Sequence, residues 1–364
     1  MLPILATGAS TTLGFSEREV GTMSLAILVG SGVSALIAGS WVRSVPWPRG
    51  ASITAGGMLL AYLVTMLVHR HWAFVVIHGT AGFFSAAVFS LAMTILSDRR
   101  EAARSFGIAT AMQAAFQVVA VMVGPALLRV MGLNGVAALL AALGGLGLLL
   151  AQLLPTHGRA VVPGRLPAGL LKPTNFTGLA GLGLFTMNVG AYWTYIELIG
   201  QSLGILSDIV ATCVAAAAAV GVLGGVAAGL LGDRFGKIAP LVFAGLLTSG
   251  AVLLLIKPLG VRAFFISGVM YFFAWNYSLA YQYAIINTVD ATGRIVAITQ
   301  AFAFLGAAAG AGMAGSYVRP GDYRAITWIV IITVWASFAM FALTLAVGKS
   351  SNATRGTATG PQKA

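Results

Sequence analysis

Long apolar stretches recur along the whole chain and are separated by short polar or basic segments. Each of eleven such stretches holds about 20 mostly apolar residues, the length that an α-helix needs to cross a bilayer. Their apolar residues do not alternate with polar ones, as the strands of a membrane β-barrel require, so the pattern predicts helices. The predicted spans cover residues 21–41, 50–68, 73–96, 106–128, 134–154, 176–199, 209–231, 239–256, 263–286, 295–317 and 325–347.

Composition places the chain among membrane proteins. Of its 364 residues, 59% are hydrophobic and only 8% are charged, whereas a soluble protein carries roughly 25% charged residues. The apolar fraction is too high for a disordered chain, and the single Cys213 excludes an internal disulfide. The net charge of +12 comes from short basic clusters between apolar stretches, which favours a topological role over a nucleic-acid partner. The fold class is therefore an all-α polytopic membrane protein in contact with the lipid bilayer.

The basic residues also predict the orientation of the chain. One set of loops holds two thirds of the Lys and Arg residues, which makes this side cytoplasmic by the positive-inside rule. These residues are Arg43, Arg49, Arg99, Arg100, Arg104, Arg159, Arg165, Lys172, Arg234, Lys237, Arg294, Lys349, Arg355 and Lys363. The excess of Arg over Lys, with abundant Ala and Gly, favours a bacterium with a GC-rich genome. A multi-pass protein of the bacterial inner membrane is expected.

The loops divide the chain into four parts. Residues 155–174 form the longest connection, on the cytoplasmic side, and their Pro, Gly and Arg content is typical of a linker. This linker separates an N-terminal helical bundle, residues 1–154, from a C-terminal bundle, residues 175–348. The polar residues 349–364, rich in Ser, Thr and Gly, predict a disordered cytoplasmic tail.

The two bundles show internal similarity. Shifting the sequence against itself by about 191 positions aligns small and polar residues, which predicts a two-fold repeat of the kind found in transporters. The small residues in each copy form a stripe along which membrane helices can approach closely. The aligned residues are Ser16 and Glu17 with Ser207 and Asp208, Gly30 with Gly221, Ser34 with Gly225, Ala38 with Gly229, and Arg43 with Arg234.

The repeat has a consequence at the N-terminus. The span 176–199 has its counterpart partly upstream of Met1, and residues 1–8 are too short to cross a bilayer. We therefore expect 11 complete spans plus a remnant of a first helix, with about 15 to 25 residues missing from the start of the sequence by the helix-length rule.

A short segment after residue 228 carries the most specific resemblance. Gly229-Leu-Leu-Gly232-Asp233-Arg234-Phe235-Gly236-Lys237 resembles the cytoplasmic loop motif of the major facilitator superfamily. The first half keeps Arg43 but has Val42 where the motif has an acid. The resemblance implies two pseudo-symmetric six-helix bundles and secondary transport by alternating access. It also implies a gating loop, formed by Gly229, Asp233, Arg234, Gly236, Lys237 and Arg43; a simple solvated turn is the alternative.

Polar and aromatic residues near the middle of four spans predict the substrate cavity. Transporters of this kind bind their substrate near the bilayer midplane between the halves. Because Trp and Tyr usually gather at the membrane interfaces, aromatic residues in mid-span stand out. Interhelical hydrogen bonding is the structural alternative for any one of them. The predicted cavity residues are Gln113, Gln117, Asn188, Tyr192, Tyr195, Trp275, Asn276, Tyr281 and Gln300.

Two titratable residues within the spans are candidates for coupling. Glu197 is the only formally charged residue in the eleven spans, and acids inside a membrane are costly and usually functional. It lies near the outer end of its span, so an interface position is an equal alternative. His78 could carry a proton near neutral pH, although packing is the commoner role of a buried His. Protons are the expected coupling ion. Asp208 is expected to cap the helix that follows it.

The sequence does not predict an enzyme. The other acids lie in loops, without a paired-carboxylate spacing, a metal-ligand cluster, a phosphate loop or a nucleophile motif. We therefore expect a monomeric secondary transporter of a small organic molecule, with no cofactor and no metal. A membrane-embedded sensor or assembly partner that keeps the same fold is the alternative, and efflux and uptake stay equally open.

Overall fold

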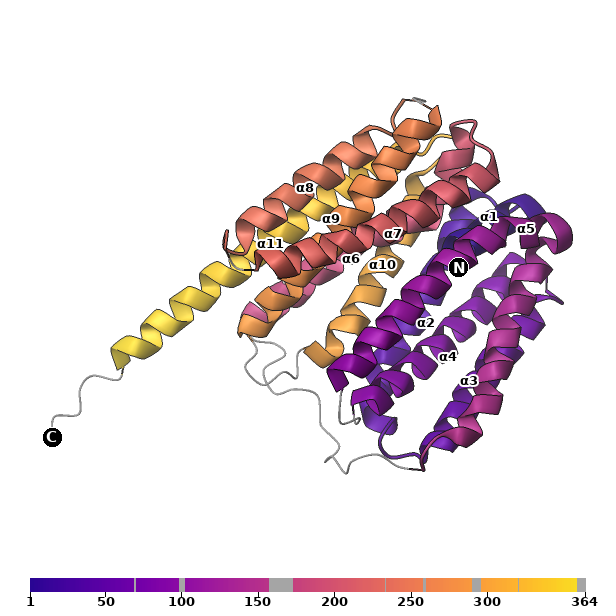
Figure 1. Cartoon of the computed structure of the whole chain (residues 1–364), viewed down its shortest axis with the longest axis horizontal. Helices are drawn as coiled ribbons and strands as arrows, with labels where there is room; N and C mark the ends of the chain where they lie inside the picture. Colours follow the sequence, from indigo (N-terminus) through magenta and orange to yellow (C-terminus); the bar gives the residue numbers. More distant parts are fainter. Residues whose placement is uncertain are drawn as a thin grey trace.

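The protein, as given by a computed structural model, is built from helices (Figure 1). The structure describes residues 1–68, 70–97, 102–156, 173–232, 234–257, 260–289, 296–319 and 321–358, and their side chains apart from those of residues 39, 97, 102–111, 113–115, 173–174, 287–289, 296–298 and 348–358. The helices in these ranges are α1 (Leu2–Leu13), α2 (Glu17–Trp41), α3 (Trp47–Thr65), α4 (His71–Ser97), α5 (Ala102–Leu150), α6 (Pro173–Ser202), α7 (Ser207–Leu231), α8 (Ile238–Leu253), α9 (Gly260–Val289), α10 (Val296–Tyr317) and α11 (Arg324–Ala358).

Local sequence signals explain several helix ends. Ser16 caps α2 in a capping box: its side chain accepts from the Glu19 amide, and the Glu19 carboxylate accepts from the Ser16 amide. Gly14 ends α1 in the left-handed conformation. Gly132, with φ 58° and ψ −153°, interrupts α5. The helix therefore consists of two segments, which correspond to the predicted spans 106–128 and 134–154.

Each predicted span coincides with a helical segment. Among the described residues, six stretches are long and apolar enough to cross a membrane, namely Glu17–Ala38, His71–Leu96, Phe116–Leu153, Ser207–Leu231, Gly260–Ile286 and Arg324–Val347. Two further helices, α1 and α8, are apolar but shorter. The all-helical membrane fold is confirmed, whereas the count of eleven spans stays a prediction.

The helices form two halves that lie side by side (Figure 1). The N-terminal half consists of α1–α5, in indigo to magenta, and the C-terminal half consists of α6–α11, in pink to yellow. Between the halves, α2 packs against α10, α5 against α7, and α1 against α6. Equivalent pairs recur within the halves, such as α2 with α4 and α7 with α9. This arrangement is the pseudo-symmetric repeat that the sequence predicts.

The small-residue stripes behave differently in the two halves. A Cβ on Gly30 would overlap the Gly79 carbonyl, so this position requires glycine for the contact between α2 and α4. In α7, the expected packing of Gly225 and Gly229 is wrong, because no other element of the described residues lies within 4 Å of a Cβ built there. Gly221, the first residue of the predicted stripe, does meet α9, and the second close contact with α9 is at Gly224.

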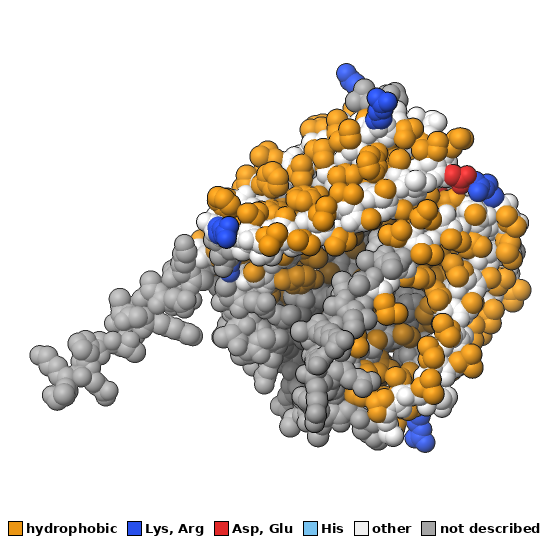
Figure 2. Space-filling view, in the orientation of Figure 1, with side chains coloured by type: hydrophobic (Ala, Val, Ile, Leu, Met, Phe, Trp, Pro, Cys, Tyr) orange, Lys and Arg blue, Asp and Glu red, His pale blue; other side chains and the backbone are white. Residues whose placement is uncertain are grey.

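The surface matches a membrane environment. Hydrophobic side chains cover much of the described part of the face seen in Figure 2, and charged side chains lie toward its edges. Leu60, Leu230 and Ile332 are each more than half exposed, as expected for side chains in contact with lipid. At the C-terminus, α11 continues to Ala358. The prediction of a disordered tail is therefore corrected for residues 349–358, where the spanning helix extends into the polar segment.

Candidate functional site

A pocket lies between the two halves, at the junction of α5, α7 and α9. Its volume is about 390 Å³. The N-terminal half contributes Gln117 and Val118 from α5, and the C-terminal half contributes Ala218, Ala219 and Val222 from α7 and Phe272, Trp275 and Asn276 from α9. Three predicted cavity residues, Gln117, Trp275 and Asn276, are therefore brought together from both halves.

Aromatic side chains form one wall of this pocket. Phe272 and Trp275 are one helical turn apart on α9, and their rings stack with centroids 5.9 Å apart. Trp193 of α6 supports Trp275 in an edge-on contact at 6.4 Å. The Asn276 amide Nδ2 donates to the Phe272 carbonyl at 2.9 Å, which fixes the side chain on the same turn. The pocket thus combines aromatic surface with two neutral amides, those of Gln117 and Asn276.

Two other predicted residues, Asn188 and Tyr192, lie inside the C-terminal half, between α6 and α9. Both are buried. Asn188 accepts from the Tyr271 hydroxyl at 2.5 Å and donates to the Phe185 carbonyl at 2.5 Å. Tyr192 stacks on Tyr271 with ring centroids 3.8 Å apart. These contacts join α6 to α9, which is the interhelical role that the sequence left as the alternative.

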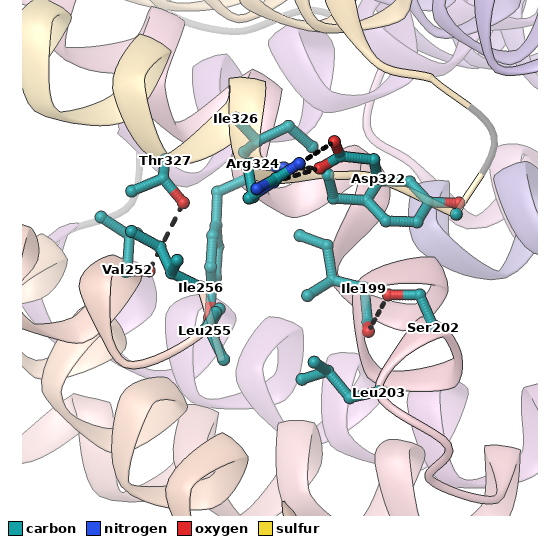
Figure 3. Close-up of a pocket in the computed structure, with 13 residues that line it drawn as sticks. Ile199, Ser202, Leu203, Val252, Leu255, Ile256, Asp322, Arg324, Ile326 and Thr327 are labelled. Carbon is teal, nitrogen blue, oxygen red and sulfur yellow. Dashed lines mark hydrogen bonds and ion pairs between the residues drawn. The ribbon is translucent and has the colours of Figure 1, made fainter. Parts of the chain in front are cut away.

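A second pocket, of about 340 Å³, lies in the C-terminal half between α6, α8 and α11 (Figure 3). Tyr192 is part of its lining. At its edge, Arg324 binds Asp322 through two hydrogen bonds, of 2.9 and 2.7 Å. These hydrogen bonds lower the pKa of the Asp322 carboxyl from its ordinary value to about 2. Asp322 is therefore ionised throughout the neutral range.

The remaining predicted cavity residues are spread over the molecule. Tyr195 donates to the Glu17 carbonyl of α2 at 2.7 Å, near the outer ends of the helices. Tyr281 is buried and donates to the Gly232 carbonyl at 3.0 Å, near the inner end of α7. Gln300 is half-buried on α10. The side chain of Gln113 lies outside the described residues.

Glu197 lies in the interface between α6 and α1. Only 3% of the residue is exposed, so the carboxyl group does not reach the headgroup region, which was the alternative expected from its place in the span. Thr7 of α1 lies beside it. One carboxyl oxygen has no hydrogen-bond partner among the described residues. An acid at this position faces both halves of the protein.

His78 lies inside the N-terminal half. Its ring is fully buried, stacks on Phe74 at 4.0 Å and meets Tyr62 edge-on at 6.3 Å. Nδ1 lies 3.0 Å from the Phe74 carbonyl, whereas Nε2 has no partner among the described residues. The ring contacts of His78 therefore come from α3 and α4 of the N-terminal half.

The predicted gating loop connects α7 to α8. Gly236 adopts a φ of 67°, which favours glycine, and Arg234 is exposed. Lys237 donates to the Ala284 carbonyl of α9 at 3.4 Å. Arg43, the counterpart of Arg234 in the first half, is half-buried, and Asp233 lies outside the described residues. Gly229 is exposed and precedes the loop at the end of α7.

Sequence reasoning missed a group of contacts near the outer ends of the two halves. Tyr323 donates to the Glu17 carboxylate at 2.6 Å, and Arg129 pairs with Asp208. From the sequence, Glu17 is expected in a loop and Asp208 at a helix cap, and no role is assigned to Tyr323 or Arg129. The alignment of Glu17 with Asp208 in the repeat was the one signal that could have singled them out.

Comparisons with known proteins agree with this architecture. A family profile described as Major Facilitator Superfamily matches residues 1–311. A crystal structure of a variant of the nucleoside transporter NupG is similar with a TM-score of 0.76 and 13% identity, over 93% of this chain and 95% of that chain. A bacterial homolog of the human lysosomal transporter Spinster, in an inward-facing and unoccupied conformation, is similar with a TM-score of 0.70 and 15% identity, over 95% and 91%. No curated protein sequence matches significantly.

The structural similarities, at such low identity, establish the fold alone, whereas the family profile covers most of the chain. Together with the paired halves and the pocket between them, this match decides the classification. The chain belongs to the Major Facilitator Superfamily, a family of transporters and not of enzymes.

Proposed function

We propose that the protein is a secondary active transporter that moves a small organic solute across the bacterial cytoplasmic membrane by alternating access. The pocket shared by α5, α7 and α9 carries this proposal, because its lining comes from both halves. Any rocking of one half against the other changes the access to such a pocket. The similar Spinster homolog, whose conformation is described as inward-facing, supports the same movement. The transporter is proposed to act as a monomer.

The pocket lining favours an uncharged, planar solute. Trp275 and Phe272 offer aromatic surface against which a flat ring can pack. The amides of Gln117 and Asn276 can each donate and accept hydrogen bonds, but they carry no charge. Among the described lining residues none is ionised at neutral pH. Nucleosides belong in the test panel because they have this chemistry and because one similar structure is that of a nucleoside transporter.

Protons are proposed as the coupling ion, with Glu197 as the group that binds them. A buried acid without a full set of partners is costly in its charged form. Because Glu197 lies between α1 and α6, one helix from each half, movement of the halves alters its surroundings. His78 is the second candidate, and its enclosure within one half makes it the weaker one.

The loop after α7 is proposed to act as an inner gate. Tyr281 holds the Gly232 carbonyl and Lys237 holds the Ala284 carbonyl, so α9 positions the loop. Asp233 and Arg234 are proposed to form contacts that exist in only one state of the transporter. Arg43 is proposed to act at the equivalent place in the first half.

Uptake into proteoliposomes tests the proposed function. We expect saturable uptake of at least one uncharged planar solute, dependent on an imposed pH gradient. Replacing Gln117 or Trp275 with Ala should lower kcat/KM about tenfold or more, since about 1.4 kcal/mol of lost contact corresponds to a factor of ten. Trp328→Ala is the matched control, because this Trp is exposed on α11 away from the pocket. Failure of a broad solute panel with folded protein would favour the sensor or assembly role.

A further inference from the structure

Two acidic residues occupy equivalent positions in the repeat. Glu17 is the first residue of α2, and Asp208 is the second residue of α7, the equivalent helix of the other half. The expectation that Asp208 caps α7 is wrong: the residue at the cap position is Leu206, and no side-chain cap hydrogen bond is made. The Asp208 side chain pairs with Arg129 of α5 instead.

Glu17 contacts the C-terminal half at two points. The Tyr323 hydroxyl donates to its carboxylate at 2.6 Å, and the Tyr195 hydroxyl donates to its main-chain carbonyl at 2.7 Å. Burial, followed by the hydrogen bond to Glu17, raises the pKa of Tyr323, so this hydroxyl keeps its proton and remains the donor. Tyr323 lies in the turn between α10 and α11. The start of α2 is thereby tied to the outer turn of the opposite half.

The helices approach closely at the same place. A Cβ on Gly21 of α2 would lie 2.7 Å from the Gly315 Cα of α10, and a Cβ on either glycine would lie 2.9 Å from the Tyr195 hydroxyl oxygen. The backbones of α2 and α10 therefore touch beside the Glu17 contacts. Opening the outer side requires these contacts to separate.

Asp208 makes the equivalent connection in the opposite direction. It extends from the start of α7, in the C-terminal half, to Arg129 near the outer end of the first segment of α5. In the repeat, this segment of α5 corresponds to α10. Glu17 thus connects the start of α2 to the outer end of α10, and Asp208 connects the start of α7 to the outer end of the first segment of α5. The two starting helices are equivalent in the repeat, and so are the two helices that they reach.

We propose that Glu17 with Tyr323, and Asp208 with Arg129, are two symmetry-related latches that hold the outer side of the transporter closed. The proposal rests on the alternating-access function proposed above. It assigns these residues a gating role, which is separate from solute binding in the pocket between α5, α7 and α9. The two latches must open together when the pocket becomes accessible from outside.

The two latches differ in strength. The Asp208 and Arg129 side chains are 56% and 59% exposed, so water and salt screen their attraction. The contact of Glu17 with Tyr323 is partly buried and joins a carboxylate to a hydroxyl donor, which makes it the stronger hydrogen bond. We therefore expect the tyrosine latch to dominate the closed state, and only the ion-pair latch to weaken in salt.

Distances between spin labels on the outer ends test the proposal. Leu67 and Leu253 suit the labels, because they are exposed near the outer ends of α3 and α8 and take no part in either latch. Each is replaced with Cys in a Cys213→Ser background, which removes the single native cysteine. Double electron–electron resonance then reports the ratio of long to short distances, which measures opening of the outer side without any solute.

We expect short distances to dominate in the unaltered protein. Tyr323→Phe should raise the ratio of open to closed protein about tenfold, as expected for a lost hydrogen bond to a charged group. Asp208→Asn should raise the ratio of open to closed protein less than about fivefold. The effect of this substitution should vanish at 1 M salt, where the ion pair is screened. Exchanging the pair, with Arg129→Asp and Asp208→Arg, should restore the closed state. Tyr317→Phe is the control, because Tyr317 is exposed at the same end of α10.

Unchanged distances in folded Tyr323→Phe and Asp208→Asn proteins would overturn the latches. Tyr323→Phe removes only a hydroxyl, and the charge exchange keeps one acid and one base. Both variants are therefore expected to fold, so that a change in distance can be assigned to the latches. The distance measurement tests the latches and the uptake assay tests the transport function, so one proposal can be rejected while the other is kept. Uptake without a shift in distance removes the latches and keeps the transporter, whereas a shift in distance without uptake keeps the latches and removes the transporter.

Discussion

At the scale of single residues, the polar groups in the spans serve two different purposes. Gln117, Trp275 and Asn276 line the pocket between the halves, whereas Asn188 and Tyr192 lie within one half and hold its helices together. The sequence could single out all five because polar and aromatic residues are uncommon in mid-span. It could not separate them, because the direction of a side chain around its helix depends on packing with partners far away in the sequence.

The outer contacts were harder to predict for a related reason. Glu17 precedes an apolar stretch and has the pattern of a helix-start residue, which it also is. Its contact with Tyr323 links residues that are distant in the sequence and belong to different halves. Only the assembled structure brings them together.

Glu197 gives the sharpest prediction at this scale. Glu197→Gln keeps the shape of the side chain but cannot bind and release a proton, so solute exchange should persist while accumulation driven by a pH gradient is lost. Exchange and gradient-driven uptake, measured in the same proteoliposomes, check this expectation. His78→Gln should retain gradient-driven accumulation, because His78 is enclosed within one half.

Asp322 is the matched acidic control. Its hydrogen bonds with Arg324 lower its folded-state pKa to about 2, so their stabilising effect is present at higher pH and is lost only as the pH falls through that value. Asp322→Asn should therefore leave the pH profile of transport between pH 5 and 8 unchanged. If Glu197→Gln also left that profile and uphill accumulation unchanged, the coupling group would lie elsewhere.

At the scale of helices, glycines decide where segments end and where they touch. Apolar periodicity correctly predicts that residues 106–128 and 134–154 are separate helical segments, and Gly132 separates them. The predicted small-residue stripe of α7 is right at Gly221 and wrong at Gly225 and Gly229, because Gly and Ala are so frequent there that the sequence offers several stripes. Close contacts with the α9 backbone at Phe272 and Phe273 determine which of them is used.

Gly132→Ala should destabilise the protein. Gly132 has a backbone conformation that is close to a region reserved for glycine, and side chains forced into such regions cost about 1–3 kcal/mol. A lower Tm in detergent checks this expectation. Gly145→Ala is the control, because that residue is helical and its Cβ would meet no other atom within 4 Å. Equal Tm values for the two variants would show that the break in α5 is not held by Gly132.

Gly21 and Gly225 form a second matched pair. Gly21→Ala should push α2 away from α10 and lower stability by about 1–3 kcal/mol, since a Cβ there would lie 2.7 Å from backbone. Gly225→Ala should be tolerated, because its surroundings are open. Thermal unfolding of both variants in detergent decides the question, and an equal loss of stability would contradict the packing described for α2 and α10.

At the scale of the whole molecule, the repeat explains most of the architecture. A pocket of about 190 Å³ in the N-terminal half is lined by residues that include Thr12, Met131 and Leu133. Adding 191 gives Leu203, Asp322 and Arg324, which all line the pocket of Figure 3. The register found in the sequence therefore holds in three dimensions. The repeat does not predict how the two halves pack against each other, because the residues at that interface differ between the two copies.

The central claim is that the pocket between the halves opens to the two sides of the membrane in turn. Ala219 tests it directly, because it is exposed in that pocket and small enough to replace. With Ala219→Cys in a Cys213→Ser background, an impermeant thiol reagent should label the resting protein from the cytoplasmic side only, since contacts join the halves near the outer ends.

Adding Tyr323→Phe with Asp208→Asn, which opens both proposed latches, should make the same cysteine react from the outer side and slow its reaction from the cytoplasmic side. Such a reciprocal change in labelling is the result that alternating access predicts. Equal labelling from both sides at once, or labelling that never changes side, would contradict it.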